Sequence, residues 1–208
     1  MLYMKTLAKL WREVRSASSV ALAELESAPG PKPTSQMCEF LILGEDQRIE
    51  LHMGVDPIAL MRSVWMTCVH RRRQGGSTVA MQLVRTLTQR YERTIWRKIS
   101  EIVLAVRLTY TFDRKDIARI YLWVAYYGWN MHGFQQAFEG ISKATGNDSK
   151  IGAANLVARL KYPQPRHLDE RQLGRISRRV HHLLALDSGS TKRGTFSGIA
   201  NHGTISNS

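Results

Sequence analysis

The chain has 208 residues, 43% of them hydrophobic, which is enough to build the core of one domain and excludes an intrinsically disordered protein. Thirty Lys and Arg residues outnumber 17 Asp and Glu residues, giving a net charge of +13. Such a surface attracts polyanions, including acidic lipid headgroups, phosphorylated substrates and nucleic acid. The two cysteines, Cys38 and Cys68, have neither a metal-binding spacing nor the pattern of a disulfide framework.

The first 26 residues have the pattern of an amphipathic helix. Leu7, Leu10, Trp11 and Val14 recur at helical spacing, and basic residues stand between them. Such a helix lies on an anionic membrane surface, or it packs on its own domain or on a partner, and the sequence leaves these alternatives open. The chain has no apolar run long enough to span a membrane and no compact apolar region typical of a signal peptide.

Composition divides the chain into three parts. A proline-rich break before residue 34 predicts a leader helix and linker over residues 1–33, and a Gly-, Ser- and Thr-rich end predicts a disordered tail over residues 188–208. The domain between them, residues 34–187, has the periodicity of an all-α fold with at most one short β-hairpin, near its start.

Helical periodicity accounts for most of this domain. Asp56 and Pro57 have the pattern of a helix start. The expected helices begin at Pro57 and Ser77 and span residues 94–110, 113–128, 133–144, 149–160 and 169–186. One apolar face of the helix that begins at Pro57 carries Ile58, Met61, Val64, Trp65 and Cys68. The helix over residues 94–110 is expected to bury Ile95, Ile99, Ile102, Val103 and Val106. In the last helix Arg175, Arg178 and Arg179 are expected to be exposed.

The first candidate for chemistry is an acidic pair, Glu45 and Asp46, followed by His52. The pair leaves the end of the apolar run 40–43, where partial desolvation makes a carboxylate a better proton acceptor. The alternative is a solvated turn whose acids are ordinary surface charges.

The second candidate begins with two glycines and a helix start. Gly75 and Gly76 allow close approach of a ligand to the backbone, and the helix that follows offers free N–H groups to an anion. Thr78, Gln82 and Arg85 share one helical face and form a plausible wall for a phosphorylated ligand. The alternative is an ordinary capped helix.

Two further clusters follow. Arg97, Lys98 and Glu101 share one helical face, either as an exposed ion pair or as cations for a pyrophosphate that the acid orients. The aromatic segment 121–129 is interpreted mainly as core, with some of its rings lining a sugar groove as the alternative.

Taken in order, these clusters resemble glycosyltransferase family 51. That family comprises the peptidoglycan glycosyltransferases, as single enzymes and as domains of bifunctional penicillin-binding proteins. The resemblance covers roughly residues 38–184 and depends on the order and spacing of motifs that are individually weak. The matching segments are Glu45–Asp46 with His52–Asp56, Gly75–Thr78 with Gln82–Leu83, Arg97–Lys98 with Glu101, Asp116–Gly128 with Gly133–Ala137, and Ala153–Leu156 with Pro163 and Arg178–Arg179.

The resemblance implies a lysozyme-like, two-lobed helical domain with a groove between the lobes. It implies that Glu45 is the general base, taking a proton from the 4-hydroxyl of an incoming lipid II molecule. That oxygen would attack the anomeric carbon of the growing glycan strand and expel undecaprenyl pyrophosphate with inversion.

The resemblance also implies roles for the remaining site residues. Arg85, Arg97 and Lys98 would stabilise the leaving pyrophosphate, and Glu101 is the second catalytic acid, in a supporting role or linked to a divalent metal such as Mg²⁺ or Mn²⁺. No other cofactor is expected. The remaining candidate substrate-binding residues are Asp46, His52, Ser77, Thr78 and Gln82.

The chain departs from the family pattern at several positions. Ile49 replaces an aromatic residue, Met81 replaces a glutamine, and Trp123 replaces an asparagine. Arg85 and Thr86 stand where the family has Lys and Asn. Arginine preserves the charge of lysine but changes the shape of a phosphate contact. These departures leave the activity of the domain open.

The resemblance implies partners and a location as well. The family acts on lipid II and glycan strands at the outer, periplasmic face of the inner membrane, so we expect a membrane surface and leave open a partner in cell-wall synthesis. The chain itself explains neither export nor anchoring.

Three other functions are open at this stage. A lysozyme-like glycan-cleaving enzyme would share the fold and a catalytic glutamate, but it would not need the cationic motifs. A catalytically silent relative would only bind lipid II or glycan. A nucleic-acid binder would use the basic segments 70–73 and 175–179, but no nucleic-acid motif supports it, so we expect none.

Overall fold

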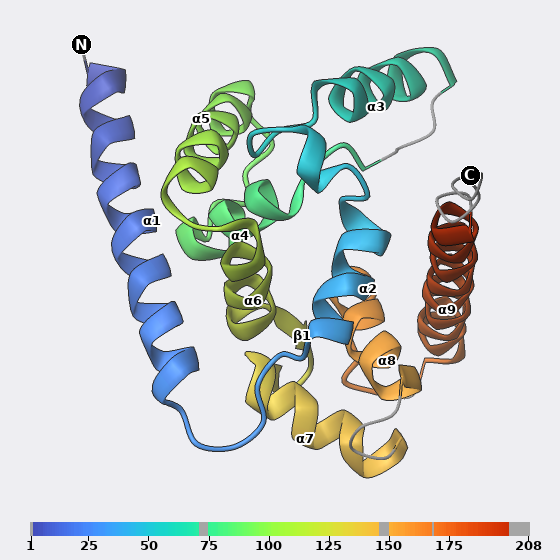
Figure 1. Ribbon diagram of the computed structural model, residues 1–208. Coiled ribbons are helices and arrows are strands. Elements are labelled where there is room, and N and C mark those ends of the chain that lie inside the picture. The colour runs from blue at the N-terminus through green and yellow to red at the C-terminus, as the bar shows by residue number, and fades with distance from the viewer. Residues whose placement is uncertain (1, 71–74, 146–149, 168, 200–208) are drawn as a thin grey trace, which may run out of the picture.

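The computed structural model describes residues 2–70, 75–145, 150–167 and 169–199, and these are almost entirely helical (Figure 1). They form nine α-helices, one 3-10 turn and a two-stranded antiparallel sheet. The elements are α1 (Leu2–Ser27), α2 (Ser35–Glu45), η1 (Ile49–Leu51), α3 (Pro57–His70), α4 (Val79–Thr88), α5 (Ile95–Thr111), α6 (Arg114–Val124), β1 (Tyr126–Gly128), β2 (Met131–His132), α7 (Phe134–Thr145), α8 (Lys150–Lys161) and α9 (Glu170–Ile199). The prediction of a mainly α-helical fold with a short hairpin is confirmed, and the likeness to lysozyme stays a prediction.

The core lies between helices α2, α4, α6 and α8. α3 and α5 stand at one end of the molecule, and α7 and α8 stand at the other (Figure 1). Each large apolar side chain that is fully buried contributes about 1.5–3 kcal/mol to folding. Side chains of this kind include Phe40 and Leu41 of α2, Met81 and Leu83 of α4, Ile120 and Leu122 of α6, and Leu156 of α8.

Helix α1 packs on its own domain through the apolar face that the sequence predicts. Leu7 and Val14 are buried in the same core as α4, α5 and α6. The Glu26 carboxylate pairs with Arg119 of α6 at 2.6 Å, which fixes the far end of the helix. Of the two alternatives for this helix, packing on the domain is therefore the one observed for its apolar face. No helix in the described residues has the length and apolar composition needed to cross a bilayer.

The hairpin does not lie near the start of the domain, where the sequence analysis placed it. α6 ends at Val124 instead of continuing to Gly128, and β1 and β2 follow directly. Gly128 has φ +138° and its backbone lies against Gln164, to which it is bridged. Asn130, at φ 56°, completes the reversal. The chain therefore uses Gly128 as a strand residue in close backbone contact and not as a helix stop.

The predicted buried face of α5 is correct in part, since Ile102 and Val103 pack against the core. Ile95 and Ile99 of α5 are exposed, because the face turned to the core carries Glu101, Leu104 and Leu108 instead. In α3 the exposed apolar side chains are Ile58, Met61, Trp65 and Val69. The side chains of Val64 and Cys68, and residues 71–74, lie outside the described part of the chain.

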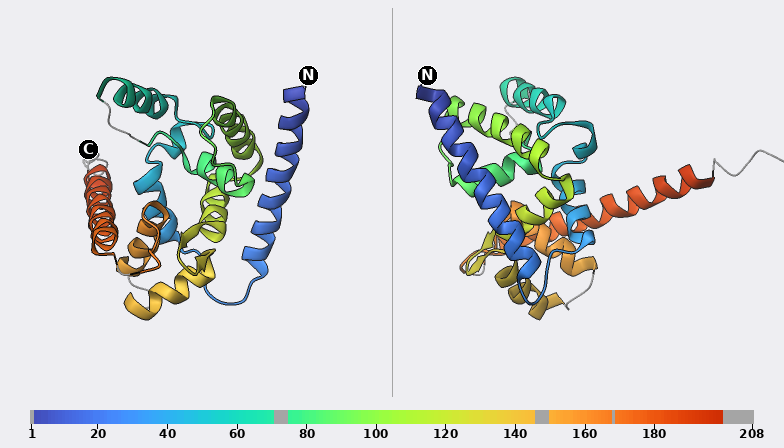
Figure 2. Two further views of the ribbon diagram at one scale, coloured as in Figure 1. Left: turned by 180° about the vertical axis from the view of Figure 1, so that it is seen from behind. Right: turned by 60° about the vertical axis from the view of Figure 1, so that its left-hand side comes forward.

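The last helix is longer than predicted and one of its arginines is buried. α9 continues past residue 186 to Ile199 and projects away from the other helices (Figure 2), and residues 200–208 lie outside the described part. Arg175 and Arg178 are exposed as expected. Arg179 is only 8% exposed, so its predicted exposure is wrong: it stands on the inner face of α9 with Ile176, Val180 and Leu183.

The close contact at Gly128 gives a stability prediction. A Cβ at this position would collide with the backbone of Gln164 and would stand at a strained φ. We expect Gly128→Ala to lower the free energy of unfolding, measured by urea denaturation, by about 3 kcal/mol. Gly174→Ala is the matched control, because a Cβ there meets open space within α9 and should stabilise by up to about 1 kcal/mol. Equal effects of the two substitutions would contradict this account.

Candidate active site

Glu45 occupies the last turn of α2, at the edge of a cavity of about 270 Å³. Thr34 caps the start of this helix by accepting the N–H of Met37, and the helix ends where Asp46 turns away. Arg179 Nη2 donates to Glu45 Oε1 at 2.7 Å, and Gln82 Nε2 donates to Glu45 Oε2 at 3.3 Å. Both carboxylate oxygens are thus held by elements far away in the sequence.

Asp46 and His52 are buried together beside the cavity. His52 Nε2 lies 2.8 Å from Asp46 Oδ1, and Asp46 Oδ2 accepts the backbone N–H of Val79 at 3.1 Å. Asp46 therefore caps the start of α4 and contributes to the cavity wall. His52 stands behind it, against a smaller internal cavity formed with Ile49 and Arg114. The two residues are therefore close together, as predicted, and His52 contacts Asp46 without lining the larger cavity itself.

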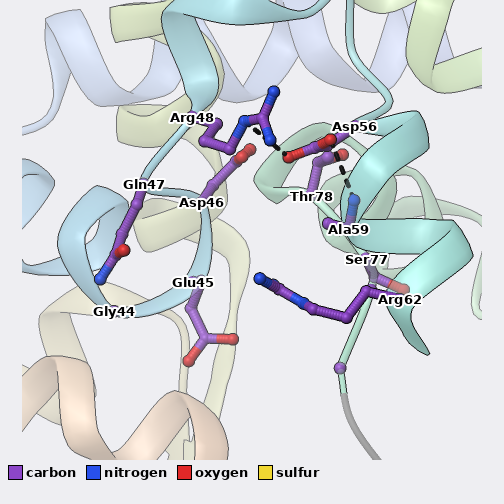
Figure 3. A pocket seen from close by; sticks show the side chains of 12 residues that line it. Gly44, Glu45, Asp46, Gln47, Arg48, Asp56, Ala59, Arg62, Ser77 and Thr78 are labelled. Atoms are coloured by element: carbon purple, nitrogen blue, oxygen red, sulfur yellow. Dashed lines mark hydrogen bonds and ion pairs between the residues drawn. The ribbon is translucent and has the colours of Figure 1, made fainter. Parts of the chain in front are cut away.

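Two arginines that the sequence analysis did not select face this cavity. Arg48 pairs with Asp56 at 3.4 Å, and Asp56 also caps α3 through the N–H groups of Ile58 and Ala59. Arg62 of α3 extends across the cavity towards Glu45 (Figure 3). The sequence offers one signal for Arg62. It is a basic residue less than two helical turns after Pro57, where the helix that follows the acidic pair begins.

The segment before α4 forms the opposite wall. Thr78 accepts the N–H of Met81 as the N-cap of α4, and its hydroxyl donates to the carbonyl of Gly54 at 2.6 Å. Gly54 has φ +85°, and a side chain there would collide with the carbonyl of Ala105. Gly75, Gly76, Ser77 and Thr78 all contact the cavity, as the glycine-rich pattern predicts.

Beyond Ser77 lies a cluster of three cations around Glu101, which is only 3% exposed. Arg85 Nη2 donates to Glu101 Oε1 at 2.9 Å, and Arg85 Nε donates to Oε2 at 3.3 Å. Lys98 Nζ donates to Oε1 at 3.0 Å, and Arg97 pairs with Oε2. Three positive charges and one negative charge leave this cluster with a net charge of +2.

Ser77 joins this cation cluster to the cavity. Its hydroxyl oxygen accepts from Lys98 Nζ at 2.9 Å and from Arg85 Nη2 at 3.3 Å, while the residue itself lines the cavity. Gln82, one helical turn before Arg85, contacts Glu45. The Glu45 carboxylate therefore lines the cavity, and the fixed cations lie behind its wall, in contact with it through Ser77.

The ionisation of the cluster follows from its geometry. Burial opposes the charge of Glu101, but the hydrogen bond with Arg85 and the charge of Lys98 outweigh it and lower the pKa of this carboxyl. Burial lowers the pKa of Lys98 despite the attraction of Glu101. Glu101 is thus an ionised acceptor with cations on both oxygens, and it is poorly placed either to transfer a proton or to coordinate a metal. Among the residues with described placement, no three His, Cys, Asp or Glu side chains gather as a metal site.

The departures from the family pattern do not face the cavity. Met81 is buried in the core, and Ile49 packs behind Asp46. Trp123 stacks on Phe134, with ring centroids 6.3 Å apart. Thr86 donates its hydroxyl to the carbonyl of its own helix one turn earlier. Only Arg85 belongs to the site, where it replaces lysine without loss of charge.

The buried carboxylate gives a pH prediction. Because the pKa of Glu101 is lowered in the folded protein, it contributes stability above its ordinary value of 4.5 and loses that contribution as the pH falls below it. Glu101→Gln should lower the unfolding free energy by about 3–5 kcal/mol at pH 7, since three cations are left without their acid. Urea denaturation should show the difference from wild type shrinking below pH 4.5.

Glu139→Gln, at an exposed position of α7, is the control for this measurement and should change stability little. A difference between wild type and Glu101→Gln that stays constant from pH 7 to pH 3 would contradict the assignment of an ionised, cation-bound Glu101.

The sequence also matches known proteins. The family model described as transglycosylase matches residues 13–186. Penicillin-binding protein 1A of Aquifex aeolicus is 39% identical over 94 residues, which is 45% of this chain and 13% of that protein. Penicillin-binding protein 1B of Haemophilus influenzae is 36% identical over 106 residues, 49% of this chain and 14% of that protein.

A longer match is to penicillin-binding protein 1A of Rickettsia felis, 25% identical over 155 residues, which is 73% of this chain and 20% of the relative. The chain thus spans about a fifth or less of the length of these relatives. The family model, by contrast, covers most of the chain and includes every residue of the cavity and of the cation cluster. The predicted resemblance is confirmed, and the chain belongs to the transglycosylase family.

Proposed function

We propose that this domain is a peptidoglycan glycosyltransferase that polymerises lipid II into glycan strands, with release of undecaprenyl pyrophosphate. The observation that carries the proposal is the cavity that has Glu45 on one side and Ser77, in contact with Lys98 and Arg85, on the other. Glycosyl transfer from a pyrophosphate needs a base at the attacking hydroxyl and positive charge at the leaving group.

Glu45 is the general base in this proposal. Its carboxylate accepts the proton of the 4-hydroxyl of lipid II as that oxygen attacks the anomeric carbon of the growing strand from the face opposite the pyrophosphate. Arg179 and Gln82 occupy one direction at each carboxylate oxygen, and a carboxylate offers about four acceptor directions, so a direction remains for the substrate.

The leaving group is stabilised by the cation cluster. The bond from the anomeric carbon to the pyrophosphate oxygen breaks as negative charge develops on that oxygen, and fixed cations there lower the barrier. Arg85, Arg97 and Lys98 supply this charge, and Glu101 is best described as a positioning residue that holds them together. No step of this mechanism uses a metal.

A glycan-cleaving enzyme is less well supported. Such enzymes use two carboxyl groups on either side of the scissile bond, and the cavity contains two carboxylates besides Glu45. Asp46 is held by His52 and by the N–H of Val79, and Asp56 caps α3 and pairs with Arg48. Neither carboxylate is available as a second acid or base, and a cleaving enzyme has no use for the cations.

An anionic membrane surface is proposed as a partner, at the outer face of the inner membrane where lipid II would be used. α3, the start of α5 and the N-terminal end of α1 lie at one end of the molecule (Figures 1 and 2). Exposed apolar side chains at this end are Ile58, Met61, Trp65 and Val69 of α3 and Ile95 and Trp96 of α5. Exposed basic side chains on α1 are Lys5, Lys9, Arg12 and Arg15. Apolar anchors beside basic residues are typical of interfacial membrane binding.

The transferase proposal is tested with labelled lipid II and purified protein, resolving products on a gel. Wild type should give a ladder of glycan strands, and Glu45→Gln should lower the rate about 100-fold or more, because the amide cannot accept the proton. Glu39→Gln is the control, since it makes the same change at an exposed position of the same helix, and it should polymerise normally.

Each alternative has its own outcome in this assay. Shortening of pre-formed glycan would favour the cleaving enzyme, and binding of lipid II without products would favour the silent relative. Either result for wild type, or unchanged polymerisation by Glu45→Gln, would contradict the proposal.

Membrane contact predicts a loss of vesicle binding when α3 carries charge. The double variant Met61→Glu with Trp65→Glu should bind vesicles of phosphatidylglycerol and phosphatidylethanolamine at least about tenfold more weakly in a sedimentation assay. Ile151→Glu, at an exposed apolar position of α8 at the far end of the molecule, is the control and should bind as wild type. Equal binding by all three proteins would contradict the proposed contact.

A further inference from the structure

The carboxylate of Glu45 is held by two arms that reach it from different helices. One arm is direct: Arg179 of α9 donates from Nη2 to Glu45 Oε1 at 2.7 Å and to the carbonyl of Gly44 at 2.7 Å. The same nitrogen therefore binds both the side chain of Glu45 and the backbone beside it. Because Arg179 is buried, its guanidinium has little freedom to follow a moving carboxylate.

The second arm is indirect and begins at Tyr121 of α6. The Tyr121 hydroxyl donates to Gln82 Oε1 at 2.8 Å, and Gln82 Nε2 donates to Glu45 Oε2 at 3.3 Å. A glutamine side chain presents either its oxygen or its NH₂ group in a given direction. With the amide reversed, Gln82 would place an oxygen against the Glu45 carboxylate, and the Tyr121 hydroxyl would meet an NH₂ group.

The environment of Tyr121 keeps its hydroxyl a donor. Burial and, after it, the nearby Glu45 carboxylate raise the pKa of Tyr121 well above its usual range. The ring is 6% exposed and packs in the core of α4 and α6, so its hydroxyl cannot easily turn to solvent. A fixed donor at this point selects the amide orientation that aims Nε2 at Glu45.

We propose that Tyr121, acting through Gln82, and Arg179 are positioning residues that hold the Glu45 carboxylate in the orientation needed to accept the substrate proton. This inference depends on the proposed function, since it assigns these residues to the same base. The other charged groups around Glu45 are Asp46 beside it, Arg48 and Asp56, which pair with each other, and Arg62 across the cavity. None of these is hydrogen-bonded to the Glu45 carboxylate among the described contacts, so the two arms fix its orientation.

The test compares two buried tyrosines that each lose one hydroxyl. Tyr121→Phe removes the hydroxyl that donates to Gln82. Tyr127→Phe removes a hydroxyl that donates to the backbone carbonyl of Leu122 at 2.6 Å and not to Gln82. Polymerisation of lipid II by Tyr121→Phe should show kcat about three- to tenfold lower with KM unchanged. Tyr127→Phe should keep kcat, although its thermal stability is expected to fall as much as that of Tyr121→Phe.

A double-mutant cycle separates positioning from general damage. In a Gln82→Ala background the tyrosine hydroxyl has nothing to orient, so adding Tyr121→Phe should change kcat by less than about twofold. For the direct arm, Arg179→Gln should lower kcat about tenfold or more, and Arg179→Lys should recover part of that loss, because it restores the charge with poorer geometry.

Defined outcomes would overturn the inference while leaving the proposed function intact. Each of them requires that the wild type polymerises lipid II. The first is an equal kcat for Tyr121→Phe and Tyr127→Phe, and the second is additive effects of Tyr121→Phe and Gln82→Ala on kcat. The third is an identical kcat for Arg179→Gln and Arg179→Lys. A wild type that makes no glycan ladder would instead reject the proposed function, and with it the role of the two arms.

Discussion

Two charged side chains stand on helical faces that are otherwise buried, and their need for partners determines the geometry of the site. Glu101 shares the inner face of α5 with Leu104 and Leu108, and Arg179 shares the inner face of α9 with Ile176 and Leu183. A buried charge without a partner costs several kcal/mol, so each of these side chains needs opposite charge beside it when its helix packs. Glu101 receives part of that charge from Arg97 and Lys98 of its own helix. α4 supplies Arg85 to the first, and α2 supplies Glu45 to the second.

This requirement explains why the Glu45 carboxylate lies on one side of the cavity and the cations lie behind Ser77 on the other. The three cations around Glu101 carry more charge than this carboxylate balances. The excess positive charge lies beside Ser77, which lines the cavity. Glu45 has the opposite arrangement, with one ion pair behind it and an open side in front. Desolvation strengthens each interaction, and it also makes the arrangement rigid, since any movement of α9 relative to α2 would separate Arg179 from Glu45.

The sequence predicted the elements of this site better than the faces they present. Motif order located Glu45, the Gly75–Thr78 segment and the cations, because chemistry restricts residue type and spacing there. The predicted inner face of α5 is wrong at Ile95 and Ile99, because the spacing of apolar residues does not show that a glutamate, Glu101, is buried on this helix. The burial of Arg179 is missed for the same reason, although its spacing from Ile176 and Leu183 is that of a core residue. The role of Tyr121 depends on its hydrogen bond to Gln82, 39 residues away in the sequence, and a single sequence does not reveal such a contact.

The same distinction decides what the departures from the family pattern mean. Ile49, Met81 and Trp123 stand within the motifs that match the family, yet their side chains pack against the interior, and the Thr86 hydroxyl donates to a carbonyl of its own helix. A substitution changes the chemistry of a site through the groups it adds to or removes from the cavity, and these four add and remove none there. The cavity keeps its carboxylate, its glycine-rich wall and its adjoining cations. The position of each side chain relative to the cavity, more than its place in a motif, therefore argues for an intact site.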